Sequence, residues 1–370
     1  AAADQSRTFR TLMAGSDFFV DQAGRQSAWL CDALADGTLL VTREWTADQW
    51  DAAFALLQGP DDTESDCLAA LRTFRHRHMV RMLWREAAQL ATVEDTFVEL
   101  SGLADCCVRA AVAFAVAALQ PKYGLPIGQE SGDEQSLVVL AMGKLGGNEL
   151  NLSSDIDLIF AYSEAGETEG GKQRLANQTY FVRLGQLVIR LLDAVTEDGF
   201  AFRVDMRLRP YGDSGALVGA FSALELYYQE QGREWERYAM VKARPITGTA
   251  AAKTSLMAML SAFVYRRYTD FSVIAALRSM KSMMRAEVTR LGIETDVKRS
   301  SGGIREIEFI AQSLQLIHGG RMPALRLQSL LPTLQALMQA EVLSTQQAQR
   351  LSDHYRLLRR VEHGLQGMAD

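Results

Sequence analysis

One stretch of the chain, residues 137–162, restricts the possible folds more than any other. It reads LVVLAMGKLGGNELNLSSDIDLIFAY. Its first six residues, 137–142, are all apolar, which is typical of a strand buried on both faces. A second apolar strand follows and carries Asp155 and Asp157. Between the strands lies a turn rich in glycine, a residue that tolerates positive φ and lets the backbone approach a ligand. These glycines are Gly143, Gly146 and Gly147.

The two aspartates are the first candidates for chemistry. Residues two apart on a strand point to the same face, so Asp155 and Asp157 are aimed together. Neighbouring carboxylates repel each other, and without a cation one of them tends to hold a proton. A divalent metal ion removes this conflict. Paired oxygens suit Mg²⁺ (or Mn²⁺), which completes its shell with water and phosphate.

A third aspartate lies on a later alternating segment. Over residues 202–208 apolar and charged residues alternate, which predicts a half-buried strand. Its polar face holds Asp205 among three arginines: Arg203, Arg207 and Arg209. Two interpretations remain open. Asp205 either pairs with these arginines in a surface network, or joins Asp155 and Asp157 as a third carboxylate.

Several motifs also carry a family resemblance. GKLGG, Glu149-Leu150 and the SDID motif that starts at Ser154 resemble the nucleotidyltransferase signature. More narrowly, GKLGGNELNLSSDIDLIF resembles the bifunctional glutamine synthetase adenylyltransferase/adenylyl-removing enzymes. The resemblance covers residues 137–250 and returns near 300–315, in GGIREIEFIAQ. The motif wording, with Met142 before the glycine, is more similar to the N-terminal, adenylyl-removing half of those enzymes.

The resemblance implies roles for particular residues. The family's three carboxylates match Asp155, Asp157 and Asp205, which would be catalytic and would hold one or two Mg²⁺ or Mn²⁺ ions. Backbone amides of the glycine turn would cradle phosphate. The candidate nucleotide- and phosphate-binding residues are Gly143, Lys144, Gly146, Gly147, Ser154, Arg207 and Arg209. Lys144 has the alternative of pointing to solvent.

The implied activity is phosphorolytic removal of AMP from adenylylated glutamine synthetase, with phosphate as nucleophile and ADP released. The implied partners are glutamine synthetase as substrate and the PII signal protein as regulator. Three alternatives stay open: the ATP-dependent adenylyltransferase half, a uridylyltransferase, and an inactive nucleotidyltransferase fold that serves as a regulatory binding module.

Composition narrows the class further. The chain has 370 residues and a net charge of −6, so nothing global favours a nucleic-acid partner. Its longest wholly apolar run, residues 110–119, is too short to span a bilayer, and we expect no membrane association. The four cysteines form no C-x-x-C pair, which favours reduced thiols and a cytoplasmic location.

The fold class that these patterns predict is α+β and predominantly helical, with a nucleotidyltransferase-type mixed sheet between two helical regions. We expect an N-terminal helical region (1–135), a catalytic core (136–250) and a C-terminal helical region (251–370). Residues 121–133 and 163–171 read as a boundary and a turn. Five arginines recur between residues 67 and 90, and we expect either a solvated basic face there or a surface that meets an acidic partner or phosphate. Arg305 and Glu308 lie on a predicted helix as either packing or nucleotide-contacting residues.

Overall fold

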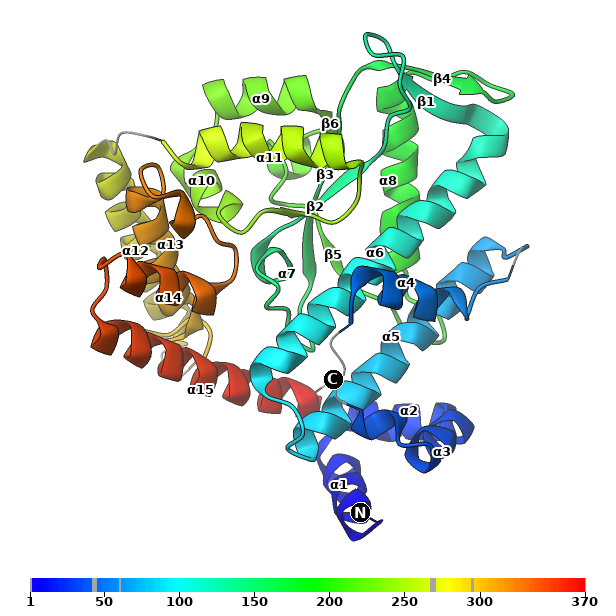
Figure 1. The fold of residues 1–370 in the computed structure, drawn as a ribbon, viewed down its shortest axis with the longest axis vertical. Helices are drawn as coiled ribbons and strands as arrows, with labels where there is room; N and C mark the ends of the chain where they lie inside the picture. The colour runs from blue at the N-terminus through cyan, green and yellow to red at the C-terminus, as the bar shows by residue number, and fades with distance from the viewer. Residues whose placement is uncertain (1, 42–44, 60, 267–270, 294–295, 370) are drawn as a thin grey trace.

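The computed structural model describes residues 2–41, 45–59, 61–266, 271–293 and 296–369. Helix accounts for 63% of the structure, which confirms a predominantly helical α+β fold. The helices of the first third follow one another along the chain (Figure 1): α1 (Ala2–Gly15), α2 (Asp17–Arg25), α3 (Ser27–Ala35), the 3₁₀ helix η1 (Thr38–Leu40), α4 (Ala47–Ala55), α5 (Glu64–Ala87) and α6 (Val93–Tyr123).

The two longest of these helices begin with the same capping arrangement. The Thr63 hydroxyl accepts a hydrogen bond from the Asp66 amide, and the Asp66 carboxylate accepts one from the Thr63 amide. Thr92 and Asp95 repeat the arrangement at the start of α6. Each pair satisfies two amides that the helix itself leaves without partners.

A mixed five-stranded sheet occupies the centre of the molecule (Figure 1). Its strands are β2 (Val138–Ala141), β3 (Ile156–Tyr162), β5 (Val204–Asp205), β6 (Val218–Ala220) and β7 (Arg244–Pro245). Strand β2 lies antiparallel between β3 and β7. Strands β5 and β6 both pair in parallel with β3, β5 near its start and β6 near its end. The predicted mixed sheet is therefore present.

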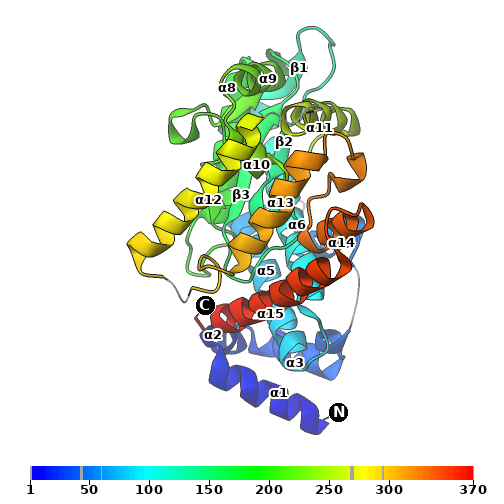
Figure 2. The same ribbon diagram turned by 90° about the vertical axis from the view of Figure 1, so that its left-hand side faces the viewer.

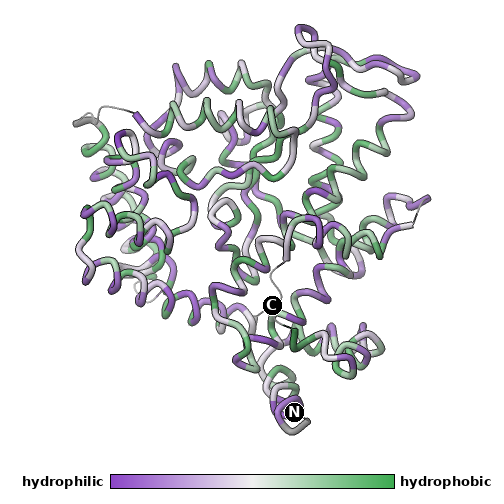
Figure 3. Tube along the Cα trace, in the orientation of Figure 1, coloured by the Kyte–Doolittle hydropathy of each residue, from purple (hydrophilic) through white to green (hydrophobic). Residues whose placement is uncertain are grey.

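Both faces of the sheet are buried, as the apolar run predicted. In β2, Val139 and Ala141 belong to a core shared with α5, α6 and α8 (Asn177–Asp193). Val138 and Leu140 belong to a second core on the opposite face, with the helices that follow the sheet. Figure 3 shows the hydrophobic residues concentrated in the central strands and along α6.

The C-terminal helices cover the second face of the sheet and one flank of the molecule (Figure 2). They are α9 (Phe221–Glu230), α10 (Glu234–Met240), α11 (Ala250–Val264), α12 (Phe271–Leu291), α13 (Ile304–His318), the 3₁₀ helix η3 (Pro323–Leu325), α14 (Leu330–Gln339) and α15 (Thr345–Ala369). Helix α15 returns to contact α2 and α6, so the last helix lies against the first third of the chain.

A two-stranded ribbon corrects two predictions. Strand β1 (Gly124–Gly128) pairs antiparallel with β4 (Gly166–Gly170), where the sequence predicted a boundary and a turn. The glycines that suggested a turn are required by the close approach of the two strands. Gly124 has φ +75°, and a Cβ there would overlap the carbonyl of Glu169. The region up to residue 135 is therefore not wholly helical.

The arginines of α5 correct a third prediction, because four of the five are buried rather than solvated. Arg72 donates to the carbonyls of Gly199 (2.9 Å) and Leu191 (3.2 Å). Arg81 and Arg85 both pair with Glu99 of α6. Each of these partners lies far along the chain or on another helix, so helical spacing alone gave no sign of them. The arginines tie α5 to its neighbours.

Helix α6 is the one helix of the described residues that is long and apolar enough to cross a membrane. That finding rests on length and composition alone, and a core helix of a soluble protein passes the same test. Here α6 packs against α4, α5 and α8, which accounts for its apolar residues.

Candidate active site

The sheet register brings two of the three predicted carboxylates side by side. Strands β3 and β5 pair in parallel with Asp157 directly opposite Asp205. Asp155 lies just before β3, where the Ile156 amide donates to the Arg203 carbonyl at 2.9 Å. Side chains opposite one another in neighbouring strands share a face. The structure therefore brings together, at the start of β3, the two aspartates paired by their spacing and the third aspartate that the resemblance implied.

The strand predicted over residues 202–208 is much shorter than expected. Only Val204 and Asp205 form β5, and residues 207–211 form turns and a bend. The Arg207 amide donates to Asp205 Oδ1 at 2.8 Å, so the aspartate binds its own backbone two residues on. This local bond favours a turn over a continued ladder. The same carboxylate that pairs with Arg207 thus ends its own strand.

The three carboxylates differ in how their charge is compensated. Arg203 Nε lies 2.5 Å from Asp155 Oδ1. Arg207 hydrogen-bonds Asp205, and this bond lowers the pKa of Asp205 although burial opposes it. No described residue forms an ion pair or hydrogen bond with the Asp157 carboxylate. Burial, and then the charge of Asp205, raise the pKa of Asp157 to about 6.

The three carboxylates have the chemistry that a divalent cation requires, but two of them, Asp155 and Asp205, are paired with arginines. Within the described ranges no group of three or more His, Cys, Asp or Glu side chains is arranged to hold a metal ion. The reason is visible in the pairing, since Asp155 faces Arg203 and Asp205 faces Arg207. A cation beside Asp157 and Asp205 would relieve the repulsion that raises the pKa of Asp157. The donor set therefore suits Mg²⁺ or Mn²⁺ once the outer carboxylates leave their arginines.

Gly143 shapes the space beside Asp157. It lies in α7 (Gly143–Gly146), the one-turn helix that the glycine-rich segment forms. Its φ is +54°, and a Cβ built there would lie 2.5 Å from Asp157 Oδ2. Position 143 therefore requires glycine for both its backbone conformation and its contact with Asp157.

A cleft of about 490 Å³ opens over the carboxylates. Seven of the ten predicted site residues line it: Gly143, Lys144, Ser154, Asp155, Asp157, Asp205 and Arg207.

The other three predicted residues are absent from the cleft lining. Gly146 packs against the backbone of Lys242, which a Cβ would overlap. The Gly147 carbonyl accepts a hydrogen bond from Ser329 Oγ at 2.6 Å. Arg209 Nη1 donates to the Met206 carbonyl at 2.8 Å. In this arrangement all three hold the local backbone.

Lys144 points neither to solvent nor freely into the cleft. Its Nζ lies 2.9 Å from Glu362 Oε1 of α15, and both side chains are nearly buried. Burial and the nearby Arg359 charge lower the pKa of Lys144 to about 8, although Glu362 acts in the opposite direction. The glycine-rich turn is therefore anchored to the last helix.

A buried ionic group beside the cleft was missed by sequence reasoning. Lys242 Nζ lies 2.9 Å from Glu149 Oε2 and 2.7 Å from Glu308 Oε1. Glu149 Oε1 also accepts the amide of Leu330, at the start of α14. Burial alone would lower the pKa of Lys242, but the two glutamates raise it above its usual value. The group joins the central motif, the turn before β7 and two C-terminal helices.

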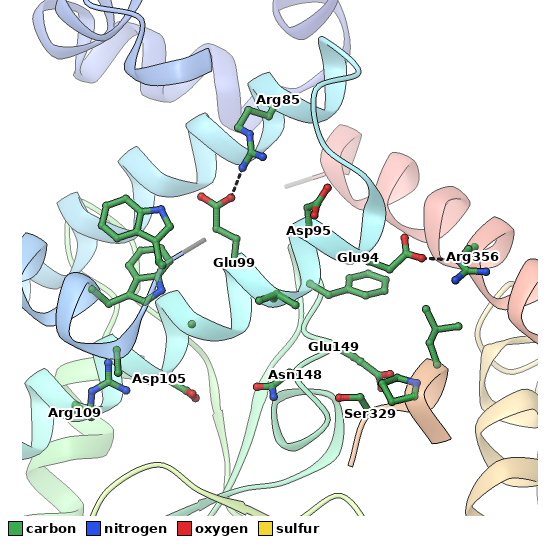
Figure 4. Close-up of a pocket in the computed structure, with 18 residues that line it drawn as sticks. Arg85, Glu94, Asp95, Glu99, Asp105, Arg109, Asn148, Glu149, Ser329 and Arg356 are labelled. Atoms are coloured by element: carbon green, nitrogen blue, oxygen red, sulfur yellow. Dashed lines mark hydrogen bonds and ion pairs between the residues drawn. The ribbon is translucent and has the colours of Figure 1, made fainter. Parts of the chain in front are cut away.

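A second cavity, of about 760 Å³, is larger but contains none of the predicted site residues (Figure 4). It lies between α4, α6 and the α14–α15 hairpin. Two ion pairs lie within its lining, Arg85 with Glu99 and Arg356 with Glu94 (Figure 4). The catalytic candidates therefore lie in the smaller cleft.

Comparison with known proteins supports one family. A family model described as glutamate-ammonia ligase adenylyltransferase matches residues 6–259. The chain belongs to this family. Residues 277–370 match a further model, described as GlnD PII-uridylyltransferase. The resemblance noted in the central motifs is thus confirmed over most of the chain.

Similar curated proteins carry the name bifunctional glutamine synthetase adenylyltransferase/adenylyl-removing enzyme. Those of Pseudomonas aeruginosa, Nitrosococcus oceani and Shewanella loihica are 49%, 48% and 45% identical to this chain, over 98–99% of its length. The chain spans only 37–38% of the length of these relatives. The matched part is roughly their N-terminal portion.

Proposed function

We propose that this chain removes AMP from adenylylated glutamine synthetase by metal-dependent phosphorolysis. The observation that carries the proposal is the in-register pair Asp157 and Asp205, joined by Asp155 in a cleft lined with cations. The names of the relatives include adenylyl removal, and the matched part is roughly their N-terminal portion. The wording of the central motif, with Met142 before the glycine, favours the same half.

In the proposed reaction, an oxygen of inorganic phosphate attacks the phosphorus of AMP. The bond between that phosphorus and the tyrosyl oxygen of glutamine synthetase breaks, and ADP and the free hydroxyl result. Such transfers depend on positioning and charge neutralisation more than on covalent help from the protein. Asp155, Asp157 and Asp205 would hold Mg²⁺ or Mn²⁺, which when bound neutralises charge on the reacting oxygens.

The protein's own groups have separate tasks in this proposal. Ser154 and Arg207 line the cleft where they can donate to phosphate oxygens. Gly143 keeps the space beside Asp157 free of a side chain. Glutamine synthetase is the proposed substrate, and the PII signal protein the proposed regulator.

The direct test uses glutamine synthetase that carries labelled AMP. Incubated with this chain, Mg²⁺ and phosphate, it should release label as ADP, and only when phosphate is present. Asp157→Asn and Asp205→Asn should each reduce the rate by about 10³-fold, because losing metal stabilisation of about 4 kcal/mol corresponds to that factor. Incorporation of label from ATP into unmodified glutamine synthetase would instead indicate the adenylyltransferase activity.

A uridylyltransferase is the second candidate, because residues 277–370 match the model for such an enzyme. It predicts transfer of UMP to a small regulatory protein. Labelled UTP offered together with PII distinguishes the two, since the first candidate leaves PII unlabelled.

A further inference from the structure

The cations that line the carboxylate cleft are nearly all paired. Six lysines and arginines contribute to its walls: Lys144, Arg203, Arg207, Lys242, Lys298 and Arg305. Five of them are in ion pairs with acidic residues: Lys144 with Glu362, Arg203 with Asp155, Arg207 with Asp205, Lys242 with Glu149 and Glu308, and Arg305 with Glu287. Within the described residues, the Lys298 ammonium alone among these six has neither an ion pair nor a side-chain hydrogen bond.

The backbone of Lys298 is fixed although its side chain has no partner. The Lys298 amide donates to Asp296 Oδ1 at 2.9 Å. Its carbonyl accepts the Arg305 amide at 2.9 Å, at the start of α13. The side chain therefore extends from an anchored turn and contributes to the lining of the cleft. An anchored backbone reduces the ordering cost of binding a ligand.

Lys298 lines the same cleft as Asp155, Asp157 and Asp205. Lys298 is also exposed, so a ligand entering the cleft can reach its ammonium group. A lysine ammonium offers three donors and binds phosphate as a compact point charge.

We propose that Lys298 is a phosphate-binding residue of this site, supplied by the C-terminal helical region. It would hold a phosphate group in the cleft that Asp157 and Asp205 also line. This proposal rests on the proposed function and assigns it a residue outside residues 136–250. The phosphate group could come from free inorganic phosphate or from the phosphates of a nucleotide, and both share the same oxyanion chemistry.

Binding measurements test Lys298 without requiring activity. Isothermal titration calorimetry would measure the affinities of the 370-residue chain for inorganic phosphate and, separately, for ADP. The variants are Lys298→Met, Lys298→Arg and Lys172→Met, the last an exposed lysine absent from the cleft lining. Loss of a hydrogen bond between charged groups predicts affinity reduced about tenfold to a hundredfold in Lys298→Met. Lys298→Arg should retain most of the affinity, and Lys172→Met all of it.

The affinities for inorganic phosphate and for ADP distinguish the two possible sources of the phosphate group. Weaker binding of phosphate alone would assign Lys298 to the free nucleophile, and weaker binding of ADP would assign it to a nucleotide phosphate. Both results support the proposal, whereas unchanged affinity of Lys298→Met for both ligands would overturn it. A rise in the KM for phosphate, with the KM for adenylylated glutamine synthetase unchanged, would extend the result to catalysis.

This design keeps the two proposals apart. If the unmodified chain binds phosphate through Lys298 but releases no ADP from adenylylated glutamine synthetase, the proposed function fails and the Lys298 assignment stands. If Lys298→Met binds both phosphate and ADP as tightly as the unmodified chain and still releases ADP from adenylylated glutamine synthetase, the assignment fails and the proposed function stands.

Discussion

The ionic group around Lys242 and the carboxylates around Asp157 are neighbours, since Lys242, Glu308 and Asp157 line one cleft, yet their charges are compensated in opposite ways. Lys242 lies between two glutamates at 2.9 and 2.7 Å, and all three side chains are largely buried. Asp157 lies opposite another aspartate, and burial leaves its pKa raised to about 6. The charges around Lys242 are compensated by one another within the protein. The carboxylates around Asp157 retain a repulsion that a cation would relieve.

The difference in charge compensation distinguishes side chains that stabilise the fold from side chains that are available to bind a ligand. Glu149 belongs to the same motif as the aspartates, yet it binds the protein rather than the cleft contents: Lys242 at one oxygen and the Leu330 amide at the other. Retained like-charge repulsion beside an open cleft is typical of functional sites. Substitutions that remove the charge of Lys242 or of Asp157 test whether the two groups differ in this way.

Lys242→Met should have the largest effect on stability. The substitution keeps the chain length of the residue but leaves Glu149 and Glu308 buried beside each other without a cation. Removing one partner of a buried ion pair typically costs about 3–5 kcal/mol. Urea unfolding should show a loss of this size, whereas Lys172→Met, at an exposed position, should change stability by less than about 0.5 kcal/mol.

A second substitution sharpens that prediction. Glu308→Gln added to Lys242→Met removes one of the two stranded charges and should recover part of the lost stability. If the single variant is as stable as Lys172→Met, the buried ionic group does not hold the helices together in the way described above.

Asp157→Asn should act in the opposite direction, stabilising the metal-free protein. The carboxylate has a pKa of about 6 in the folded state, above the ordinary value of 3.8. Between these pH values the folded protein binds a proton that the unfolded chain has released, so stability falls as the pH rises. Above about pH 6 the penalty is complete, about 2–3 kcal/mol. The asparagine variant should therefore gain about this much at pH 8 and nothing at pH 3.5.

Asp205→Asn provides the matched control, with the opposite sign. Arg207 lowers the pKa of Asp205, so this carboxylate contributes stability at neutral pH that is lost as the pH falls below its ordinary value. Its asparagine variant should be less stable than the unmodified protein at pH 8.

In Mg²⁺ or Mn²⁺ the melting temperature of the unmodified protein should rise, and that of Asp157→Asn should not. A metal-dependent rise that persists in Asp157→Asn would remove this residue from the metal site.

Sequence patterns predicted the parts of the structure that depend on short-range order. The apolar runs predicted β2 and β3. The separation of two residues between Asp155 and Asp157 predicted that these side chains lie together at the start of β3. The helical period gave α8, over Asn177–Asp193. The resemblance supplied Asp205 as a third carboxylate, and the register of β5 against β3 brings it opposite Asp157.

Partners distant in the chain account for what the sequence did not predict. Lys242 and Glu149 are separated by 93 positions, and no periodicity connects them. The ribbon of β1 and β4 was hidden because the glycines required by close strand contact also signal turns. Lys298 drew no attention, since a lysine in a polar turn is ordinary until the cleft is seen around it.

Gly143→Ala should have the smallest effect on stability and a selective effect on the site. A residue with a Cβ at φ +54° costs about 1–2 kcal/mol. Gly132→Ala controls for this strain, because Gly132 has φ +71° and open space around its Cβ position. Only at position 143 would the new methyl group meet the Asp157 carboxylate, at 2.5 Å. Both variants should lose similar stability, while Gly143→Ala alone should lose the metal-dependent rise in melting temperature. An equal metal-dependent rise in melting temperature in the two variants would mean that the Asp157 side chain shifts to accommodate the new methyl group and still binds the metal. Its strand, and not Gly143, would then determine the position of the carboxylate.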